Sequence, residues 1–276
     1  MCQLACLWDD DQVAALREAL EAALIEVRLR KGFLRRKLFR SRMERDARQT
    51  AERLTSVAMQ QHGVRALTRT DVVNYIAGRI EAQSYLEIGV SDPRNNFNLV
   101  QVKHKDGVDP AGKCSHPVTS DEFFARNARV YDLIYIDGLH LAEQVLRDVE
   151  NSLRFLAPRG VIALHDCNPM EEAWQIEEYD GVSLWCGTVW KAIAQLRATR
   201  SDLWMGTVHA DHGVGVIMRG QQERFPLDDG QEWNYSFLDR HRRELLHLLS
   251  WRDFRAEFET QLSNLKILFG NTTHFE

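Results

Sequence analysis

The chain has 276 residues, a formal net charge of -5 and 44% hydrophobic residues, a composition typical of a globular protein. The acidic balance argues against a dedicated nucleic-acid-binding protein, whose charge is usually basic. No apolar run reaches the roughly 18 residues of a membrane-spanning helix, and the first ten residues lack the basic start and apolar core of a secretory signal. The five cysteines show no C-x-x-C spacing, and an odd number suits a reducing compartment, so we expect a cytoplasmic location.

Residues 1–66 are expected to form a helical arm. Apolar residues recur at steps of three and four between positions 13 and 27, after three aspartates placed where a helix N-terminus favours negative charge. Residues 28–48 contain ten Lys or Arg with apolar residues between them. Two interpretations stay open: a basic surface for a membrane or nucleic acid, and a solvated arm that packs on the domain or on a second subunit.

A second helix is expected over residues 68–80, with Thr70 or Asp71 as its N-cap. It carries an apolar stripe that we expect to be buried, made of Val72, Val73, Ile76 and Ile80. A helix at these residues leads directly into the first strand and is placed to help cover a ligand bound at the end of that strand.

Residues 84–109 carry the strongest local pattern. A short apolar run from Tyr85 to Ile88 ends at Gly89, which indicates a buried strand that enters a tight turn. A polar loop follows, and Asp109 comes about 20 positions after the glycine. At this spacing a doubly wound α/β sheet presents a carboxylate to a ribose, so the pattern predicts a nucleoside-type ligand.

The residues after Gly89 narrow the choice of nucleoside. A dinucleotide site needs G-x-G-x-x-G, because the pyrophosphate approaches bare backbone at a helix N-terminus. Here Ser91 and Arg94 stand at the second and third glycine positions. A ligand with ribose and adenine but no phosphates needs one close backbone approach, plus acidic groups for an ammonium and for the ribose hydroxyls. S-Adenosylmethionine is such a ligand.

Two further strands are expected to end in polar side chains at the same edge of the sheet. Residues 131–136 form an apolar run followed by Asp137 and His140, and residues 161–164 form another, followed by His165-Asp166-Cys167-Asn168. Parallel strands present their carboxyl ends at one edge, where open α/β sheets bind their ligands. The capping box Thr119-Ser120-Asp121-Glu122 predicts a helix start between these units and the first strand.

These residue types suit methyl transfer to a hydroxyl group, which requires positioning and removal of a proton. His140 is the best candidate base, because the unperturbed pKa of histidine lies near neutrality. The carboxylates Asp137 and Asp166 are suited to Mg²⁺, which would acidify an acceptor hydroxyl. Each carboxylate also has a plainer interpretation as a ligand contact or a helix cap, and His165 is interpreted as structural.

The rest of the chain is expected to close the domain. Residues 168–188 hold acids and aromatics without periodicity, so they form either a lid over the acceptor or an ordinary surface insertion. Residues 203–218 predict a hairpin with its turn at 210–213, and His209 and His212 are interpreted as surface residues. From Trp233 onward a packing or subunit-contact helix is expected.

The chain resembles class I S-adenosylmethionine-dependent methyltransferases, in the branch of macrocin O-methyltransferase-like and cephalosporin-hydroxylase-like proteins. The likeness covers about residues 70–220, and it rests on YLEIGVSD (85–92), KDGVDP (105–110), SHPVTSDEFF (115–124), YDLIYIDGLHLAEQVLRDVE (131–150) and LAPRGVIALHDCNP (156–169). It implies an α/β, three-layer Rossmann-like fold with a seven-stranded mixed sheet whose last strand is antiparallel. The implied domains are the arm 1–66, a cofactor-binding domain 67–220 and a helical extension 221–276.

The resemblance also implies roles for individual residues. The cofactor would be bound by Glu87, Gly89, Ser91, Asp109, Ser120, Asp121 and Asp137, with Ser120 and Asp121 at the adenine. Asp137 and His140 would lie at the reacting centre, and Mg²⁺ would be held by Asp137, Asp166 and Asn168. The implied reaction is O-methylation of a small molecule such as a sugar or a glycosylated metabolite. Separately from the resemblance, the two amphipathic terminal helices favour a homo-oligomer.

Two alternatives stay open. The first is an inactive methyltransferase-like scaffold that binds a protein partner, which is supported by the basic arm and by Pro93, where the resembling family often has a glycine. The second is an NAD-dependent oxidoreductase with a similar sheet, which the absent second and third glycines disfavour.

Overall fold

The computed structural model describes residues 66–179, 181, 184–227 and 230–269. From Leu67 onward the described residues belong to one compact unit. The predicted helical arm, with its basic segment 28–48, lies outside the described residues, so its two interpretations stay predictions.

A seven-stranded mixed sheet runs through this unit, in the spatial order β2-β1-β3-β4-β6-β5-β7. The first four strands are mutually parallel, and β6 is antiparallel to both of its neighbours. The fold class is therefore the predicted one. The antiparallel strand closes the predicted hairpin, while the last strand along the chain, β7, is only two residues long and pairs in parallel with β5. The strands are β1 Ser84–Ile88, β2 His104–Val108, β3 Tyr131–Ile136, β4 Leu156–Leu164, β5 Leu203–Val208, β6 Val214–Arg219 and β7 Leu248–Leu249.

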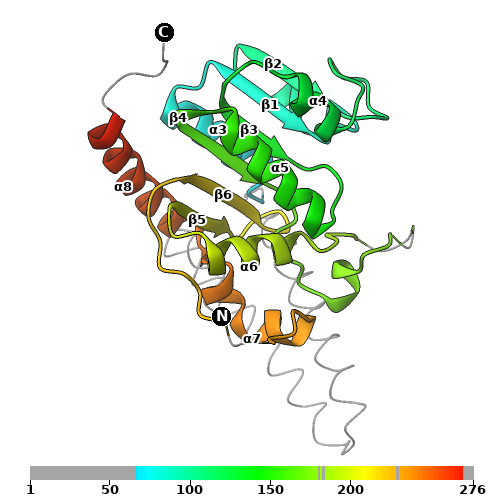
Figure 1. The fold of residues 1–276 in the computed structure, drawn as a ribbon, viewed down its shortest axis with the longest axis vertical. Helices are drawn as coiled ribbons and strands as arrows, with labels where there is room; N and C mark the ends of the chain where they lie inside the picture. Colours follow the sequence, from blue (N-terminus) through cyan, green and yellow to red (C-terminus); the bar gives the residue numbers. More distant parts are fainter. Residues whose placement is uncertain (1–65, 180, 182–183, 228–229, 270–276) are drawn as a thin grey trace, which may run out of the picture. The chain divides into compact units, whose positions relative to one another are not determined.

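Helices cover both faces of the sheet and complete the three layers (Figure 1). Aromatic and aliphatic residues of α4, α5, α6 and α7 share one buried cluster with one face, and residues of α3 and α8 share the other. The helices are α3 Arg69–Ile80, α4 Ser120–Arg126, α5 Ala142–Arg154, α6 Val189–Thr199, α7 Tyr235–Leu245 and α8 Trp251–Phe269, with short 3-10 turns η2 Phe97–Leu99 and η3 Glu172–Gln175. No helix in the described part of the chain is both long enough and apolar enough to cross a membrane.

Helix α3 is the predicted second helix, and its apolar stripe is buried as expected. Val72, Val73 and Ile76 have no exposed surface, and burying such a side chain contributes about 1.5–3 kcal/mol. The predicted N-cap was wrong by two or three positions. Thr68 caps the helix and forms a capping box with Asp71, because the backbone at Thr68 is extended while Thr70 already lies within the helix.

The C-terminal segment differs from the single helix expected there. The chain breaks at His247, whose φ of 44° lies in the left-handed region, and Leu248–Leu249 then add β7 to the edge of the sheet. Helix α8 follows and buries Phe254, Phe258 and other residues against the face that α3 also covers. The described part of segment 221–276 thus supplies both an edge strand and part of one helical layer.

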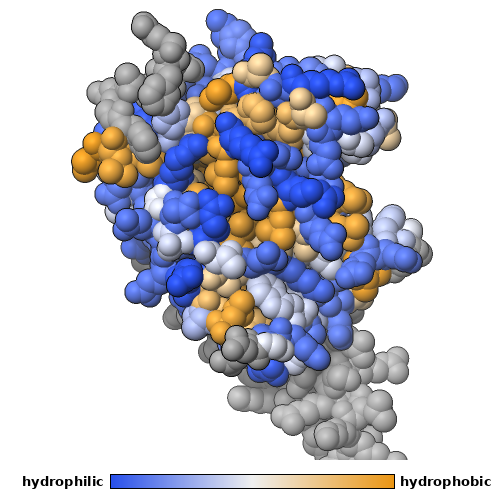
Figure 2. Space-filling view, in the orientation of Figure 1, coloured by the Kyte–Doolittle hydropathy of each residue, from blue (hydrophilic) through white to orange (hydrophobic). Residues whose placement is uncertain are grey.

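The strand order places a topological switch point between β1 and β3. From β1 the chain crosses to β2 on one side, and it then returns to form β3 on the other side. Crevices outside the carboxyl ends of the strands at such a point are where open α/β sheets bind ligands. Figure 2 shows the surface hollowed at this edge, between the part around α4 and the part around loop 168–188.

Candidate functional site

A cavity of about 680 Å³ lies at the carboxyl ends of β1, β2, β3 and β4. This is within the usual range for small-molecule sites. The structure brings all seven residues predicted for the cofactor into its lining: Glu87, Gly89, Ser91, Asp109, Ser120, Asp121 and Asp137. His140 and Asp166 line it as well.

Gly89 turns the chain directly after β1, with a φ of 85°. A Cβ at this position would stand 2.1 Å from the carbonyl oxygen of Asp137, directly after the neighbouring strand β3. No side chain fits there, so the backbone itself forms this part of the cavity wall.

Asp109 connects the loops that follow β1 and β2. One carboxylate oxygen accepts a hydrogen bond from the N–H of Ser91 (2.9 Å), and the other accepts from the N–H groups of Ala111 and Gly112 (2.8 and 2.7 Å). Ser91 adopts a left-handed φ of 46° to make its bond. The carboxylate predicted to contact the ribose is therefore held in place by the backbone.

Glu87 is the one buried carboxylate of β1, with 2% of its surface exposed. It accepts hydrogen bonds from the Tyr85 hydroxyl and from the Asn96 amide, whose oxygen in turn accepts from Thr70. Burial raises the pKa of Glu87 to about 7, although the bonds from Tyr85 and Asn96 oppose the shift. Near neutral pH, Glu87 is therefore present in both its protonated and its ionised form.

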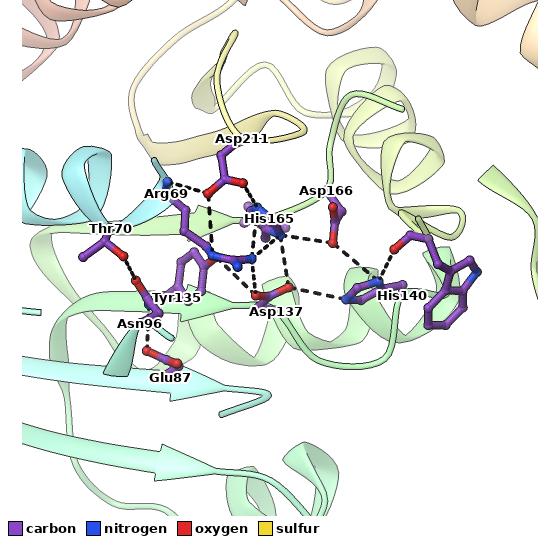
Figure 3. A network of polar contacts seen from close by, with 12 residues as sticks. Arg69, Thr70, Glu87, Asn96, Tyr135, Asp137, His140, His165, Asp166 and Asp211 are labelled. Atoms are coloured by element: carbon purple, nitrogen blue, oxygen red, sulfur yellow. Dashed lines mark hydrogen bonds and ion pairs between the residues drawn. The ribbon is translucent and has the colours of Figure 1, made fainter. Parts of the chain in front are cut away.

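Asp137 lies at the centre of a charged network (Figure 3). Its two oxygens lie 3.4 Å from His140 Nε2, 3.4 Å from His165 Nδ1 and 3.3 Å from Arg69 Nη1. Burial alone would raise the pKa of Asp137, but the charge of His165 and the hydrogen bonds from both histidines outweigh it and lower the pKa. Asp137 is therefore a stable carboxylate.

His140 joins the two predicted carboxylates. Its Nε2 faces Asp137, and its Nδ1 lies 3.5 Å from Asp166 and 3.2 Å from the carbonyl oxygen of Trp185. The Trp185 indole stacks on the imidazole, with ring centroids 4.8 Å apart. Burial lowers the pKa of His140, but the hydrogen bond with Asp137 and the charge of Asp166 more than offset this, so the pKa is raised.

His165 is more central than predicted. It is 5% exposed and lies between three carboxylates, with Nδ1 3.1 Å from Asp166 and Nε2 3.6 Å from Asp211. Burial would lower the pKa of His165, but Asp137 and the bonds to Asp166 and Asp211 raise it well above its ordinary value. The imidazolium therefore holds the carboxylates of three different loops together.

Arg69 and Asp211 belong to this network and were missed by the sequence analysis. The backbone N–H of Arg69 donates to Asp211 (2.8 Å), and its guanidinium reaches both Asp137 and Asp211. Burial would raise the pKa of Asp211, but the bonds from His165 and from the Arg69 N–H lower it to about 2. The only sequence signal was the predicted turn at 210–213, which says nothing about the direction of its side chains.

The turn between β5 and β6 is strained where it meets the site. Asp211 and His212 have φ values of 43° and 61°, and Gly213 follows at 92°. A non-glycine residue in the left-handed region costs about 1–2 kcal/mol, and such strain gathers at functional sites. His212 was predicted to lie on the surface, but it is half-buried and packs edge-on against His165 and Trp174. His209, also predicted at the surface, is half-buried and contacts Asn168.

The side-chain oxygen of Asn168, predicted as a metal ligand, is paired with a guanidinium. This oxygen accepts from the buried guanidinium of Arg242 (2.6 Å), which also donates to the carbonyl oxygen of Pro169 (2.7 Å). Helix α7 thereby anchors the start of loop 168–188, and the amide is committed to that anchor. Within the described residues, the group whose donor atoms could share a metal ion is Asp137, His140 and Asp166, with those atoms within 4.8 Å of one another.

Comparison with known proteins agrees with this architecture. A family model described as a methyltransferase domain matches residues 15–167, which is more than half of the chain. The chain therefore belongs to the methyltransferase-domain family. This confirms the predicted class of S-adenosylmethionine-dependent methyltransferases, while membership of the macrocin-like branch stays a prediction.

Individual relatives of this methyltransferase chain are distant. The uncharacterized protein y4gI of Sinorhizobium fredii is 30% identical over 91 residues, a stretch that makes up 33% of this chain and 8% of that protein. The chain thus matches only a small share of that protein's length. Two solved structures are similar at low identity: the O-methyltransferase of Bacillus cereus in complex with SAH (13% identical, 55% of this chain and 82% of that one, TM-score 0.41) and TomG of Streptomyces achromogenes, an O-methyltransferase involved in tomaymycin synthesis, in complex with SAM (11%, 58% and 85%, TM-score 0.40).

Proposed function

We propose that this methyltransferase chain transfers a methyl group from S-adenosylmethionine to a hydroxyl oxygen of a small molecule. The observation that carries the proposal is a single cavity that combines a glycine turn and a held carboxylate for the cofactor with a histidine between two aspartates. S-Adenosylmethionine, when bound, would supply the electrophilic methyl group. The cofactor fits the lining, because Asp109 can accept from ribose hydroxyls and Glu87 can accept from an ammonium group.

His140 is the proposed base, and Nε2 is the nitrogen proposed to take the proton. A carbonyl oxygen only accepts hydrogen bonds, so the contact with Trp185 requires a hydrogen on Nδ1. In the neutral imidazole Nε2 then carries the lone pair, so its hydrogen bond to Asp137 forms only when Nε2 is protonated. Nε2 lies 3.4 Å from Asp137, whose charge would stabilise the imidazolium formed after proton transfer. Trp185 would fix both the tautomer and the ring plane.

The charge balance of the cluster supports this role. Three carboxylates, Asp137, Asp166 and Asp211, face Arg69 and the imidazolium of His165. The carboxylates outnumber these two basic groups, which leaves a local excess of negative charge beside His140. That charge would stabilise the protonated His140 that forms in the reaction. It would also stabilise a metal cation bound beside His140 before the reaction.

Asp137 and Asp166 would hold a divalent cation in this proposal. Their oxygens fit Mg²⁺, which prefers oxygen ligands, and its chemistry would be to lower the pKa of an acceptor hydroxyl. Asn168 is no longer part of the proposed set. His140 is also within reach of a metal ion held by these carboxylates. An imidazole that bound the metal through Nε2 would lose the lone pair needed for proton transfer, so we assign His140 the role of base and not that of ligand.

The acceptor is proposed to be a ring-shaped small molecule, such as a sugar or a glycosylated metabolite, as the macrocin-like resemblance suggests. Aromatic side chains of loop 168–188 support this. Trp185 stacks on His140, and Tyr179, 58% exposed, lies 5.6 Å from Trp185 between ring centroids. Flat aromatic faces beside the proposed base suit a ring held for in-line attack.

Calorimetric titration with S-adenosylhomocysteine tests the proposal. We expect binding in the micromolar range, and a drop of at least about tenfold in affinity for Asp109→Ala. A screen of hydroxylated acceptors, with Mg²⁺ and after chelation, then tests the metal and His140→Asn tests the base. Absence of any binding would refute the proposal, and binding without turnover would favour the inactive scaffold. NAD⁺ is titrated in parallel, and its binding would favour the oxidoreductase.

A further inference from the structure

We infer that Gly187 and Thr188 are positioning residues for His140. They hold the His140 backbone so that Nδ1 stays against the carbonyl oxygen of Trp185, which leaves the lone pair of the neutral ring on Nε2. The inference deepens the proposed function and rests on it, because the lone pair on Nε2 matters only if His140 is the base.

Gly187 lies directly against the backbone of His140. Its φ of 55° is in the left-handed region, which glycine adopts without strain. A Cβ at this position would lie 2.6 Å from the Cβ of His140 and closer still to the His140 carbonyl oxygen. Any other residue would therefore push the two segments apart.

Gly181 shows that this closeness is particular to Gly187. It belongs to the same loop and also has a positive φ, of 77°. A Cβ at Gly181 would meet no atom within 4 Å. The turn at Gly181 needs only the backbone freedom of glycine, whereas Gly187 needs that freedom and the missing side chain as well.

Thr188 bonds to the chain on both sides of the His140–Leu141 peptide. Its backbone N–H donates to the His140 carbonyl oxygen (2.8 Å), and its hydroxyl oxygen accepts from the N–H of Ala142 (2.8 Å). Ala142 begins α5, and the N-cap residue Leu141 offers no side-chain bond. Thr188 thus caps α5 from another segment. It is 3% exposed, so water has little access to replace the hydroxyl.

These backbone contacts act on the imidazole through Trp185, just before Gly187. The Trp185 carbonyl oxygen lies 3.2 Å from His140 Nδ1, and the indole stacks on the ring with centroids 4.8 Å apart. Trp185 is itself held, because its indole N–H donates to the carbonyl oxygen of Ile176 (2.7 Å). Segment 185–188 therefore contacts His140 at the ring face, at Nδ1 and at the backbone carbonyl.

Two groups compete for the single hydrogen of the neutral imidazole. The Trp185 carbonyl oxygen favours it on Nδ1, and Asp166, 3.5 Å from Nδ1, favours the same form from farther away. Asp137, 3.4 Å from Nε2, favours a hydrogen on Nε2, and that tautomer has no lone pair there for proton transfer. By holding Trp185 beside Nδ1, Gly187 and Thr188 decide this competition.

Proton–nitrogen correlation NMR of the full chain, with isotope-labelled histidine, tests the inference without an acceptor. Such spectra distinguish the protonated from the unprotonated ring nitrogen, and the His140 signals are identified by their absence from His140→Gln. The measurement is made at a pH high enough to leave the imidazole neutral. We expect the wild-type chain to favour the Nδ1–H tautomer at least about tenfold.

Gly187→Ala and Thr188→Val should each reduce this preference to near unity. The first forces the two segments apart, and the second leaves the N–H of Ala142 without its acceptor. Gly181→Ala, which changes a glycine of positive φ without a new contact, is the matched control and should keep the preference. Thr188→Ser retains the hydroxyl and should keep it too. Residues that only stabilised the fold would lower the melting temperature and leave the tautomer unchanged.

The outcomes separate this inference from the proposed function. An Nε2–H tautomer in the wild-type chain would overturn the inference, and retention of the Nδ1–H tautomer by a folded variant would overturn the role of the residue changed in it. Circular dichroism shows whether each variant folds. If Gly187→Ala does not, Thr188→Val and the wild-type spectrum still decide. Absence of S-adenosylhomocysteine binding to the wild-type chain in calorimetry would overturn the proposed function, whichever tautomer is found.

Discussion

Glu87 offers the sharpest physical test, because a single isosteric change alters its titration. Its side chain is 2% exposed and accepts two hydrogen bonds through one oxygen, from Tyr85 and Asn96. In Glu87→Gln the amide oxygen can accept both bonds, while the NH₂ group takes the place of the other carboxylate oxygen. The variant thus imitates the protonated acid at every pH.

The size of the effect follows from the pKa. Burial raises the pKa of Glu87 from 4.5 to about 7. Between these values the folded chain binds one proton more than the unfolded chain, so the free energy of unfolding decreases as pH rises. Each pH unit is worth about 1.4 kcal/mol, so ionising Glu87 costs the folded wild-type chain about 3 kcal/mol above pH 7. The glutamine variant avoids this cost.

Urea denaturation of both proteins measures the difference. At about pH 5 the two should have similar free energies of unfolding, and at about pH 8.5 the Gln variant should be more stable by up to about 3 kcal/mol. Comparing the two proteins at each pH cancels the titration of the histidines, which is common to both. Glu150→Gln, which also replaces a carboxylate but at an exposed position, is the matched control. A constant difference between wild type and Glu87→Gln across this range would refute the reasoning.

Three further changes test the frame of the site. Gly89→Ala should lower the free energy of unfolding by at least about 3 kcal/mol or prevent folding, because the new Cβ would meet a backbone oxygen at 2.1 Å. Gly78→Ala is the control: the position in α3 has open space around it, so this change should raise the melting temperature slightly. Arg242→Met should lower the free energy of unfolding in urea by about 3–5 kcal/mol, because it leaves the buried oxygens at the start of loop 168–188 without a donor. Arg243→Met, at an exposed position, should be nearly neutral. Equal effects of the two changes would contradict the role of Arg242 as an anchor. Asp109→Asn should weaken S-adenosylhomocysteine binding about tenfold in calorimetry with little change in melting temperature, and unchanged affinity would show that the ribose lies elsewhere.

Local pattern determined most of the architecture. Apolar runs, turn residues and the spacing from Gly89 to Asp109 were enough to predict the parallel strands, the hairpin and the edge of the sheet at which the cavity lies. These features depend on neighbours along the chain: alternation, a glycine at a positive φ, and a capping box such as Thr119 with Glu122, which the structure confirms. Because parallel strands point the same way, the carboxyl ends of β1, β2 and β3 are expected at the same edge of the sheet.

Only the tertiary structure decided the partners of the charged residues. Arg69, Asp137, His165 and Asp211 come from four segments far apart in the sequence, and which carboxylate an imidazole meets depends on side-chain directions in three dimensions. Asn168 looked like a ligand because it follows a strand end, but Arg242, about 70 residues later, takes its oxygen. The sequence by itself therefore determined where the site lies and which residue types reach it. The fold decided how their charges pair, because electrostatic partners are set by distance in space and not along the chain.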